Sequence, residues 1–324
     1  MPRPTTIAAK LAHLQGLAAD PAEEAAYATS LLSERSTRLL EAALAVLERA
    51  PNGALPADAR AALRDLYERL DANGPRDDAG GTLRAAIVRL LRRLARPADA
   101  DLFERAALTF EFQPPGREEV TAMLRATALA ALNALDDDLG ASYAARLLVD
   151  AYTSPMSGEP ALTAARVLAA QGQWLPLYAY AAGDGRRQPE VLSECLRALT
   201  RLPAPLLADL VDRYIEGDDE LALVGLFDLL FDHPDGEAHA ARLAAFLGET
   251  RHYGAHRYLC TLIVARRSEV LLPALIALAE EERDPHKWES LAEALSLLDG
   301  SGRGGRRVDT ALRRLRARMD DAQR

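Results

Sequence analysis

The sequence predicts an all-α protein in which short helical hairpins stack side by side into a right-handed α-solenoid. Three observations predict this fold. Alanine, leucine and arginine dominate the 324 residues, and residues of these types lose little rotamer freedom in helices. Apolar residues recur at steps of three, four and seven, which is typical of amphipathic helices. Turn residues divide these helices into pairs with a period of about 32 residues, within the range of solenoid repeats.

The first half of the chain shows a loose form of this pattern. Residues 1–34 fit it least, and we expect them to form a helical cap on the stack. Amphipathic segments then follow in pairs, at 37–47 with 57–70, 83–94 with 98–110, and 120–135 with 139–149. Almost no segment has the composition of a strand.

The second half repeats the pattern more regularly. Val191, Cys195 and Leu202 fall on one helical face, and a turn at Gly217 closes the helix that follows. Further helices are expected at 203–214, 220–231, 236–247, 255–265, 269–278 and 285–298. Glycine, aspartate and proline stand between these segments, where they stop one helix and cap the next. The chain is therefore expected to hold about seven to eight hairpins.

One helix start carries a known repeat pattern. The peptide Gln188-Pro189-Glu190-Val191, followed by Cys195 and then by Ala198-Leu199, resembles the HEAT-like pattern Asp-Pro-x-Val-Arg-x-x-Ala-x-x-Ala-Leu. Leu192 replaces the arginine of that pattern, and Cys195 replaces its first alanine. The resemblance is to the bilin-lyase-type HEAT-like repeats of the armadillo and HEAT superfamily.

Two later segments, at 218–225 and 284–295, carry the same small-residue spacing more loosely. Small residues at a helix contact let neighbouring hairpins approach closely, and an aspartate and a proline start the second helix. We therefore expect an N-terminal cap over 1–34, a repeat region over 35–300 and a glycine hinge with a basic helix over 301–324. Tetratricopeptide and ankyrin motifs are not found.

Charge divides the chain unevenly. The net charge of -9 argues against a surface broadly built to neutralise phosphates. The tail is positive, with arginines at 303, 306, 307, 313, 314, 316, 318 and 324. Its apolar side, with Val308, Leu312 and Leu315, predicts that it caps the last hairpin. Binding of nucleic acid or an acidic partner through the tail is the alternative.

Cysteine and lysine usage adds two expectations. Cys195 and Cys260 lie in apolar helical stretches, and the first residues lack the pattern of a secretory signal, so a reduced, cytoplasmic protein is expected. No apolar run reaches the roughly 18 residues of a membrane helix. Lys10 and Lys287 are the lysines of an arginine-rich chain, a bias that we interpret as codon usage without a mechanistic role.

His252, His256 and Cys260 are spaced by four on a predicted helix, so all three could point the same way as metal ligands. A fourth ligand is missing, and Cys260 borders an apolar stripe, so we predict no metal. The histidines fall where the HEAT-like pattern has its aspartate and arginine. Those positions resemble the polar ladder that links neighbouring repeats and faces the binding groove of such families.

Other motifs predict structure more than chemistry. Residues 300–305 match Gly-x-Gly-x-x-Gly, but they follow a helix where a dinucleotide fold needs a strand, so we expect a hinge. The acidic runs at 136–138 and 218–220 each precede a helix and are expected to cap it and not to bind a cation. Ser193 and Ser290 lack a nucleophile elbow. We therefore predict no catalytic residue and no cofactor.

These observations together predict a non-enzymatic scaffold or adaptor that binds a protein or peptide along a groove lined by the second helix of each hairpin. Trp174 and Tyr178 lie four apart, as interface aromatics can, although core filling is the simpler role. The expected contact residues are Glu194, Arg197, His252, His256, Trp174 and Tyr178. The alternative is a nucleic-acid-binding protein or a HEAT-like enzyme, of the DNA glycosylase or bilin lyase kind, which the acidic balance disfavours.

Overall fold

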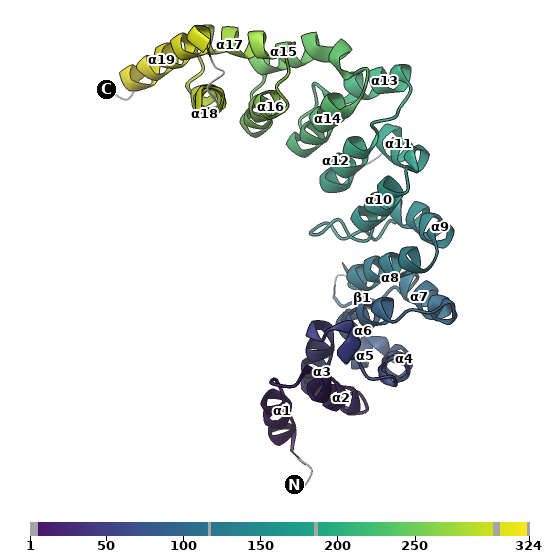
Figure 1. Ribbon diagram of the computed structural model, residues 1–324. Coiled ribbons are helices and arrows are strands. Elements are labelled where there is room, and N and C mark those ends of the chain that lie inside the picture. Colours follow the sequence, from purple (N-terminus) through teal and green to yellow (C-terminus); the bar gives the residue numbers. More distant parts are fainter. Residues whose placement is uncertain (1–5, 116–117, 185–186, 301–304, 323–324) are drawn as a thin grey trace. The chain divides into compact units, whose positions relative to one another are not determined.

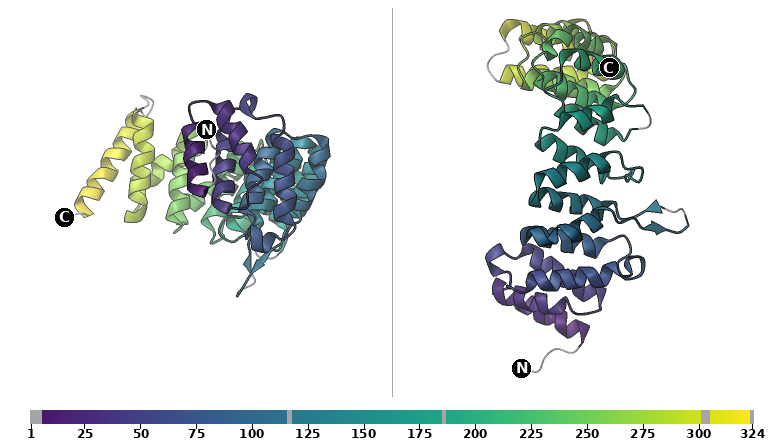
Figure 2. Two further views of the ribbon diagram at one scale, coloured as in Figure 1. Left: turned by 90° about the horizontal axis from the view of Figure 1, so that it is seen from below. Right: turned by 90° about the vertical axis from the view of Figure 1, so that its right-hand side faces the viewer.

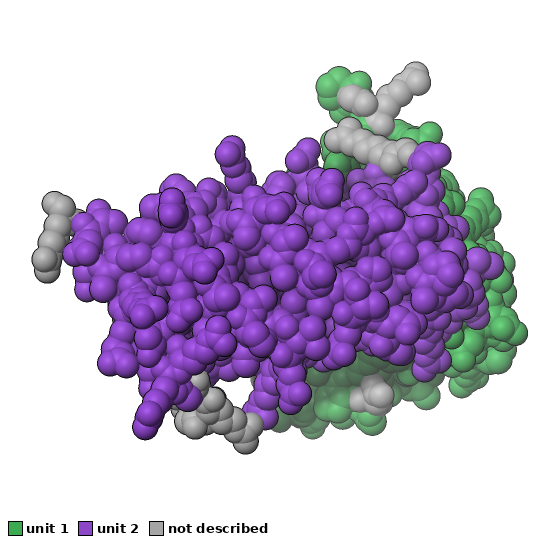
Figure 3. All heavy atoms as spheres, turned by 90° about the horizontal axis from the view of Figure 1, so that it is seen from above, with its two compact units in different colours: residues 1–171 green, residues 172–324 purple. Residues whose placement is uncertain are grey.

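The computed structural model describes residues 6–115, 118–184, 187–300 and 305–322, and helices make up most of them (Figure 1). The predicted all-α class is therefore confirmed. The chain divides into two compact units, Met1–Gln171 and Gly172–Arg324, which Figure 3 colours separately. This boundary differs from those predicted near residues 35 and 300. None of the described helices combines the length and the apolar composition that a membrane crossing requires.

Unit 1 consists of helices joined by turns and by two longer segments, 108–121 and 149–160. Its helices are α1 (Ile7–Gly16), α2 (Pro21–Leu31), α3 (Thr37–Arg49), η1 (Asn52–Ala54), α4 (Ala59–Asp71), α5 (Gly74–Asp77), α6 (Thr82–Arg93), η2 (Pro97–Asp99), α7 (Ala100–Ala107), α8 (Ala122–Leu135), α9 (Asp137–Leu148) and α10 (Ala161–Ala170). Helix α3 packs on α6, α6 on α8 and α8 on α10, while α7 and α9 cover α8 from another side. Two helices, α1 and α2, occupy the segment predicted as a helical cap.

Unit 2 arranges its helices in two rows. The helices are α11 (Trp174–Ala182), α12 (Pro189–Ala198), α13 (Ala204–Tyr214), α14 (Glu220–Asp232), η3 (Gly236–His239), α15 (Ala240–Glu249), α16 (Tyr253–Ala265), α17 (Leu272–Glu281), α18 (Pro285–Gly300) and α19 (Gly305–Ala322). Each of α12, α14, α16 and α18 packs on the next, and we call these four helices the even row. The odd-numbered helices pack beside them, with α15 on α17 and α17 on α19 (Figures 1 and 2).

One short hairpin of strands was not predicted. β1 (Phe112–Gln113) and β2 (Glu118–Glu119) pair antiparallel, with Phe112 opposite Glu119. Helix α7 ends at Ala107 and α8 begins at Ala122, so the helices predicted at 98–110 and 120–135 are too long on this side. Aromatic residues alternate around Glu111, and Pro114-Pro115 cannot continue a helix, which explains the local switch to extended backbone.

Acidic residues cap helices as predicted. Asp136 accepts a hydrogen bond from the backbone N–H of Leu139 at 2.9 Å, at the start of α9. Asp219 accepts from the N–H groups of Leu221 and Ala222 at 2.9 and 3.1 Å, at the start of α14. Both carboxylates therefore satisfy amides that a helix end leaves without a partner.

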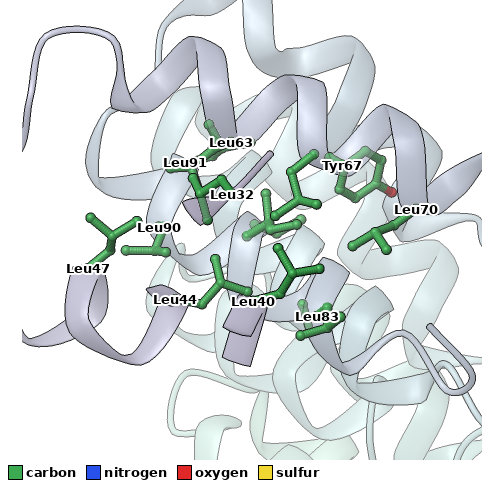
Figure 4. Packing of buried hydrophobic residues seen from close by; sticks show 14 of the residues in the cluster. Leu32, Leu40, Leu44, Leu47, Leu63, Tyr67, Leu70, Leu83, Leu90 and Leu91 are labelled. Atoms are coloured by element: carbon green, nitrogen blue, oxygen red, sulfur yellow. The ribbon is translucent and has the colours of Figure 1, made fainter. Parts of the chain in front are cut away.

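Leucine and alanine build the core. In unit 1, leucines of α3, α4 and α6 interdigitate around Tyr67 (Figure 4). In unit 2, Gly225 lets α14 approach α12, because a Cβ there would lie 2.6 Å from the carbonyl oxygen of Ser193 and 2.7 Å from its Cα. Gly225 ends the segment 218–225, whose small-residue spacing predicts a close helix contact. Cys195 and Cys260 are free thiols in this core, and burial raises the pKa of both, that of Cys260 to about 12.

Candidate interaction surface

A polar chain of side chains crosses three helices of the even row. The Nε–H of Arg197 on α12 donates to Asp228 Oδ2 on α14 at 2.8 Å. The hydroxyl of Tyr258 on α16 donates to the other carboxylate oxygen of Asp228 at 2.6 Å. Asp228 is only 7% exposed, so its charge is satisfied from both neighbouring helices and not by water.

Further links of the same kind join the rest of the row. Arg266, directly after α16, pairs with Asp232 on α14 at 2.9 Å, and Arg257 on α16 pairs with Glu293 on α18 at 2.8 Å. The backbone N–H of Gly254 donates to a Glu220 oxygen at 3.2 Å. The linked residues lie 30 to 36 positions apart in the chain. Contacts between residues that lie a nearly constant distance apart in the sequence thus link neighbouring helices of the row.

The electrostatics of this surface are set by paired arginines and additional carboxylates. Burial raises the pKa of Tyr258, and its hydrogen bond to Asp228 adds to the shift, to about 12. Tyr258 is therefore a neutral donor at every physiological pH. Arg197, Arg257 and Arg266 each face a carboxylate on a neighbouring helix, so these arginines are paired within the row. Further carboxylates, at Glu190 and Glu289 among others, leave the row acidic.

Two of the predicted contact residues lie on this surface. Arg197 keeps 47% of its side chain exposed, and it lies 3.8 Å from the carboxylate of Glu194 one turn earlier. Glu194 is half-buried. Asp228 and Tyr258 were missed, although Arg197, Asp228 and Tyr258 are separated by 31 and 30 residues, close to the period that the sequence predicts. Matching polar residues at that interval would have found them.

His256 does not lie on the surface, so the expectation that it contacts a partner is wrong. Its ring is 0% exposed and its Nδ1 lies 2.9 Å from Ser290 Oγ on α18. Burial lowers the pKa of His256 to about 4, with Lys287 as the second cause, so the ring is neutral and its Nδ1–H donates to Ser290. Ser290 in turn donates to the Lys287 carbonyl at 2.8 Å, so it is not poised as a nucleophile.

His252 lies apart from that cluster, at the position before α16 begins. Its Nε2 is 3.9 Å from an Asp218 carboxylate oxygen, and its side chain is 31% exposed. It lines a pocket of about 300 Å³ whose apolar wall includes Ile215 and Phe246 and whose rim carries Arg251. Only His252 of the two predicted histidines can therefore meet a ligand from solvent.

Metal ligands do not gather in the described part of the chain. Cys260 Sγ lies 3.8 and 3.9 Å from the two ring nitrogens of His256, but both side chains are buried and His252 is on the surface. Within residues 6–115, 118–184, 187–300 and 305–322, no three His, Cys, Asp or Glu side chains are grouped to hold a metal ion. Most of the glycine motif, residues 301–304, lies outside these ranges.

Trp174 and Tyr178 lie on α11, outside the even row, and both are half-buried. Leu175 between them is 62% exposed, so this helix fills the core on one side only. The structure does not place these aromatics in the row of Arg197 and Tyr258. They remain exposed enough for a contact of their own.

Lys287 has a structural role that the sequence analysis missed. Its side chain is 3% exposed, and its ammonium donates to the carbonyls of Leu247 and Gly248 at 3.1 and 2.7 Å. These carbonyls end α15, where a cation is favoured by the helix dipole.

The basic helix α19 buries its apolar side and exposes most of its arginines. Val308, Leu312 and Leu315 are at most 4% exposed, and α19 packs on α17 and α18. Arg318 donates to the carbonyls of Ala279 and Glu282, which end α17. Arginines at 306, 307, 313, 314 and 316 are exposed. The helix thus covers the end of unit 2 and also presents positive charge.

Comparisons with known proteins add no family. No family model matches the chain, and no curated protein matches it. A solved structure of an engineered protein is similar over 95% of this chain and 94% of its own, at 15% identity and a TM-score of 0.42. A TM-score this low carries no argument about fold or function.

Proposed function

We propose that the protein is a non-enzymatic scaffold or adaptor of HEAT-like repeats, and that the even row of unit 2 binds a protein or peptide partner. The observation that carries this proposal is the chain of links from Arg197 through Asp228 to Tyr258. Side-chain links at nearly constant sequence intervals are what a stack of repeats requires. The same links hold the exposed faces of successive helices in fixed register.

A fixed row of helices suits an extended partner. The arginines of the row are paired with carboxylates of neighbouring helices, so the partner does not need to be anionic. Affinity would come from exposed apolar groups between the pairs, of which Leu221 on α14 and Leu297 on α18 are 43% and 59% exposed. Interface energy usually resides in such a few well-placed apolar anchors.

Affinity capture with matched variants tests this proposal. The full chain, a Leu221→Glu and Leu297→Glu double variant, and a control with Leu175→Glu and Val270→Glu are each used to capture proteins from native lysate. Leu175 and Val270 are 62% and 48% exposed and lie outside the even row. We expect at least one protein to be retained by the wild type and the control and lost from the even-row variant. Equal capture by all three chains would contradict the proposal.

Nucleic-acid binding through α19 is the second candidate function, because the exposed side of this helix carries arginines that an anion can reach. Charge reversal at Arg306, Arg307 and Arg313 tests it. A labelled duplex should bind the wild type at low salt and lose binding in this triple variant. Equal binding by both chains would remove α19 from this role.

A further inference from the structure

Unit 1 presents an aromatic surface on its hairpin and on the loop after α9. Phe110, Phe112 and Tyr152 are 38%, 44% and 49% exposed. The Tyr152 ring centroid lies 5.6 Å from that of Phe110 and 5.1 Å from that of Phe112, both in edge-to-face geometry. We call these three residues the aromatic platform. The hairpin and the 150–160 loop project side by side from unit 1 in two views (Figures 1 and 2).

Two further apolar side chains are exposed close to Tyr152 in the chain. Val149 is 69% exposed and Met156 is 90% exposed, and both belong to the segment that carries Tyr152. Large apolar groups are costly to leave in water when they are contiguous, and contiguous patches mark interaction sites.

A buried arginine holds the platform in place. Arg125 on α8 is 0% exposed and donates to Glu119 of β2 at 2.6 Å and to the Tyr152 carbonyl at 3.1 Å. It also pairs with Asp150, and its guanidinium carbon lies 4.3 Å from the centroid of the Phe110 ring. Burying an ion costs several kcal/mol per charge. These buried ion pairs fix the hairpin and the loop after α9 in place. Less conformational entropy is therefore lost when a partner binds.

In the ion pairs that involve Glu111, Glu119 and Asp150, close to the platform residues in the chain or across the hairpin, carboxylates outnumber cations. Arg84 on α6 is 1% exposed and is paired with Asp71, Asp78 and Glu111 at 3.2, 3.0 and 2.6 Å. One cation therefore faces three carboxylates. Arg125 likewise faces two carboxylates. Glu111 stands between Phe110 and Phe112 in the chain, is 8% exposed, and its Oε2 has no hydrogen-bond partner within the described ranges.

We propose that the aromatic platform docks a segment of a partner protein in which an arginine or lysine side chain stands next to an apolar one. The apolar side chain covers the exposed rings of Phe112 and Tyr152. The cation lies against a ring face and is attracted by the carboxylate excess around Glu111. This surface belongs to unit 1 and is separate from the even row of the proposed function.

Peptide display on the full chain tests the proposal. Randomised dodecapeptides are selected against the wild type. The enriched peptides are then measured on a Phe112→Ser and Tyr152→Ser double variant and on a Leu175→Ser and Val270→Ser control. We expect enrichment of arginine or lysine beside an aromatic or aliphatic residue. Binding to the platform variant should be weaker by about tenfold or more, which corresponds to about 1.4 kcal/mol, and binding to the control should be unchanged.

Three outcomes would overturn the proposal: enrichment of acidic or uncharged peptides, no enrichment, or equal binding by the platform variant. Self-association of the wild type that the platform variant abolishes would assign the surface to a second copy of the chain instead. If the double variant does not fold by circular dichroism, Glu118→Lys at an exposed position of β2 replaces it. This variant should weaken binding of the cationic peptides, and unchanged binding would refute the charge argument.

Discussion

The neutral, buried His256 makes the stability of unit 2 depend on pH. The pKa of a histidine is about 6.5 in the unfolded chain and is lowered to about 4 in the fold by burial and by Lys287, while Glu282 and Asp284 act in the opposite direction. Between these two values the unfolded chain binds more protons than the fold. Stability from this group is therefore fully present above about pH 6.5 and is lost as the pH falls toward 4. The difference corresponds to about 3 kcal/mol.

Urea unfolding followed by tryptophan fluorescence measures this effect, because Trp174 and Trp288 both belong to unit 2. The free energy of unfolding is compared between the wild type and His256→Asn at pH 7.5 and at pH 4. The asparagine amide can still donate to Ser290 but does not titrate. We expect the advantage of the wild type to shrink by about 3 kcal/mol at the lower pH. A constant difference between the two chains would refute the reasoning, and the exposed His286→Asn serves as the control.

Four further substitutions test the packing described above. Gly225→Ala should lower the free energy of unfolding by about 1–3 kcal/mol, because its Cβ meets the Ser193 backbone. Gly248→Ala should raise the free energy of unfolding by about 0.5–1 kcal/mol, because a Cβ there meets nothing within 4 Å. Equal effects of the two substitutions in urea unfolding would contradict this. Lys287→Met should lower the free energy of unfolding by about 2 kcal/mol, because the carbonyls that end α15 lose their donor. The same fluorescence assay measures this, and an unchanged free energy would contradict the capping role. Arg125→Met should lower the free energy of unfolding by about 3–5 kcal/mol, because it leaves two buried carboxylates without a cation. An unchanged thermal melt by circular dichroism would show that these carboxylates are not charged.

The helices could be predicted because their signals are local. The apolar stripe, the capping aspartates at 136 and 219, and the small residue at Gly225 act within one helix or one contact. The predicted helix boundaries were less accurate where turn residues, and not helix propensity, decide where a helix begins. The helix predicted at 236–247 is a short 3-10 turn followed by α15 from Ala240, and the helix predicted at 269–278 begins later, at Leu272.

The polar contacts were harder to predict because they depend on register between helices. His256 stands four residues before Cys260 and three before Leu259, both of them 0% exposed, so its spacing already placed it on the apolar stripe. His256 was predicted at a ladder position, but a residue at such a position can face the next helix and not the solvent. Lys287 shows the same difficulty, since its acceptors lie 39 and 40 residues away on α15.

The two proposed surfaces differ in the contacts that are expected to drive binding, and this difference gives a test that separates them. Binding to the even row is proposed to depend on apolar anchors such as Leu221 and Leu297, so a partner bound there should lose little affinity as salt increases. Carboxylates outnumber cations in the ion pairs close to the platform residues, so a cationic segment bound there should weaken clearly between low and physiological salt. Affinities measured at both salt concentrations would show the contrast. A platform ligand whose affinity does not change with salt would mean that apolar burial alone drives its binding. A strongly salt-dependent partner of the even row would mean that the carboxylates of the row contribute to binding.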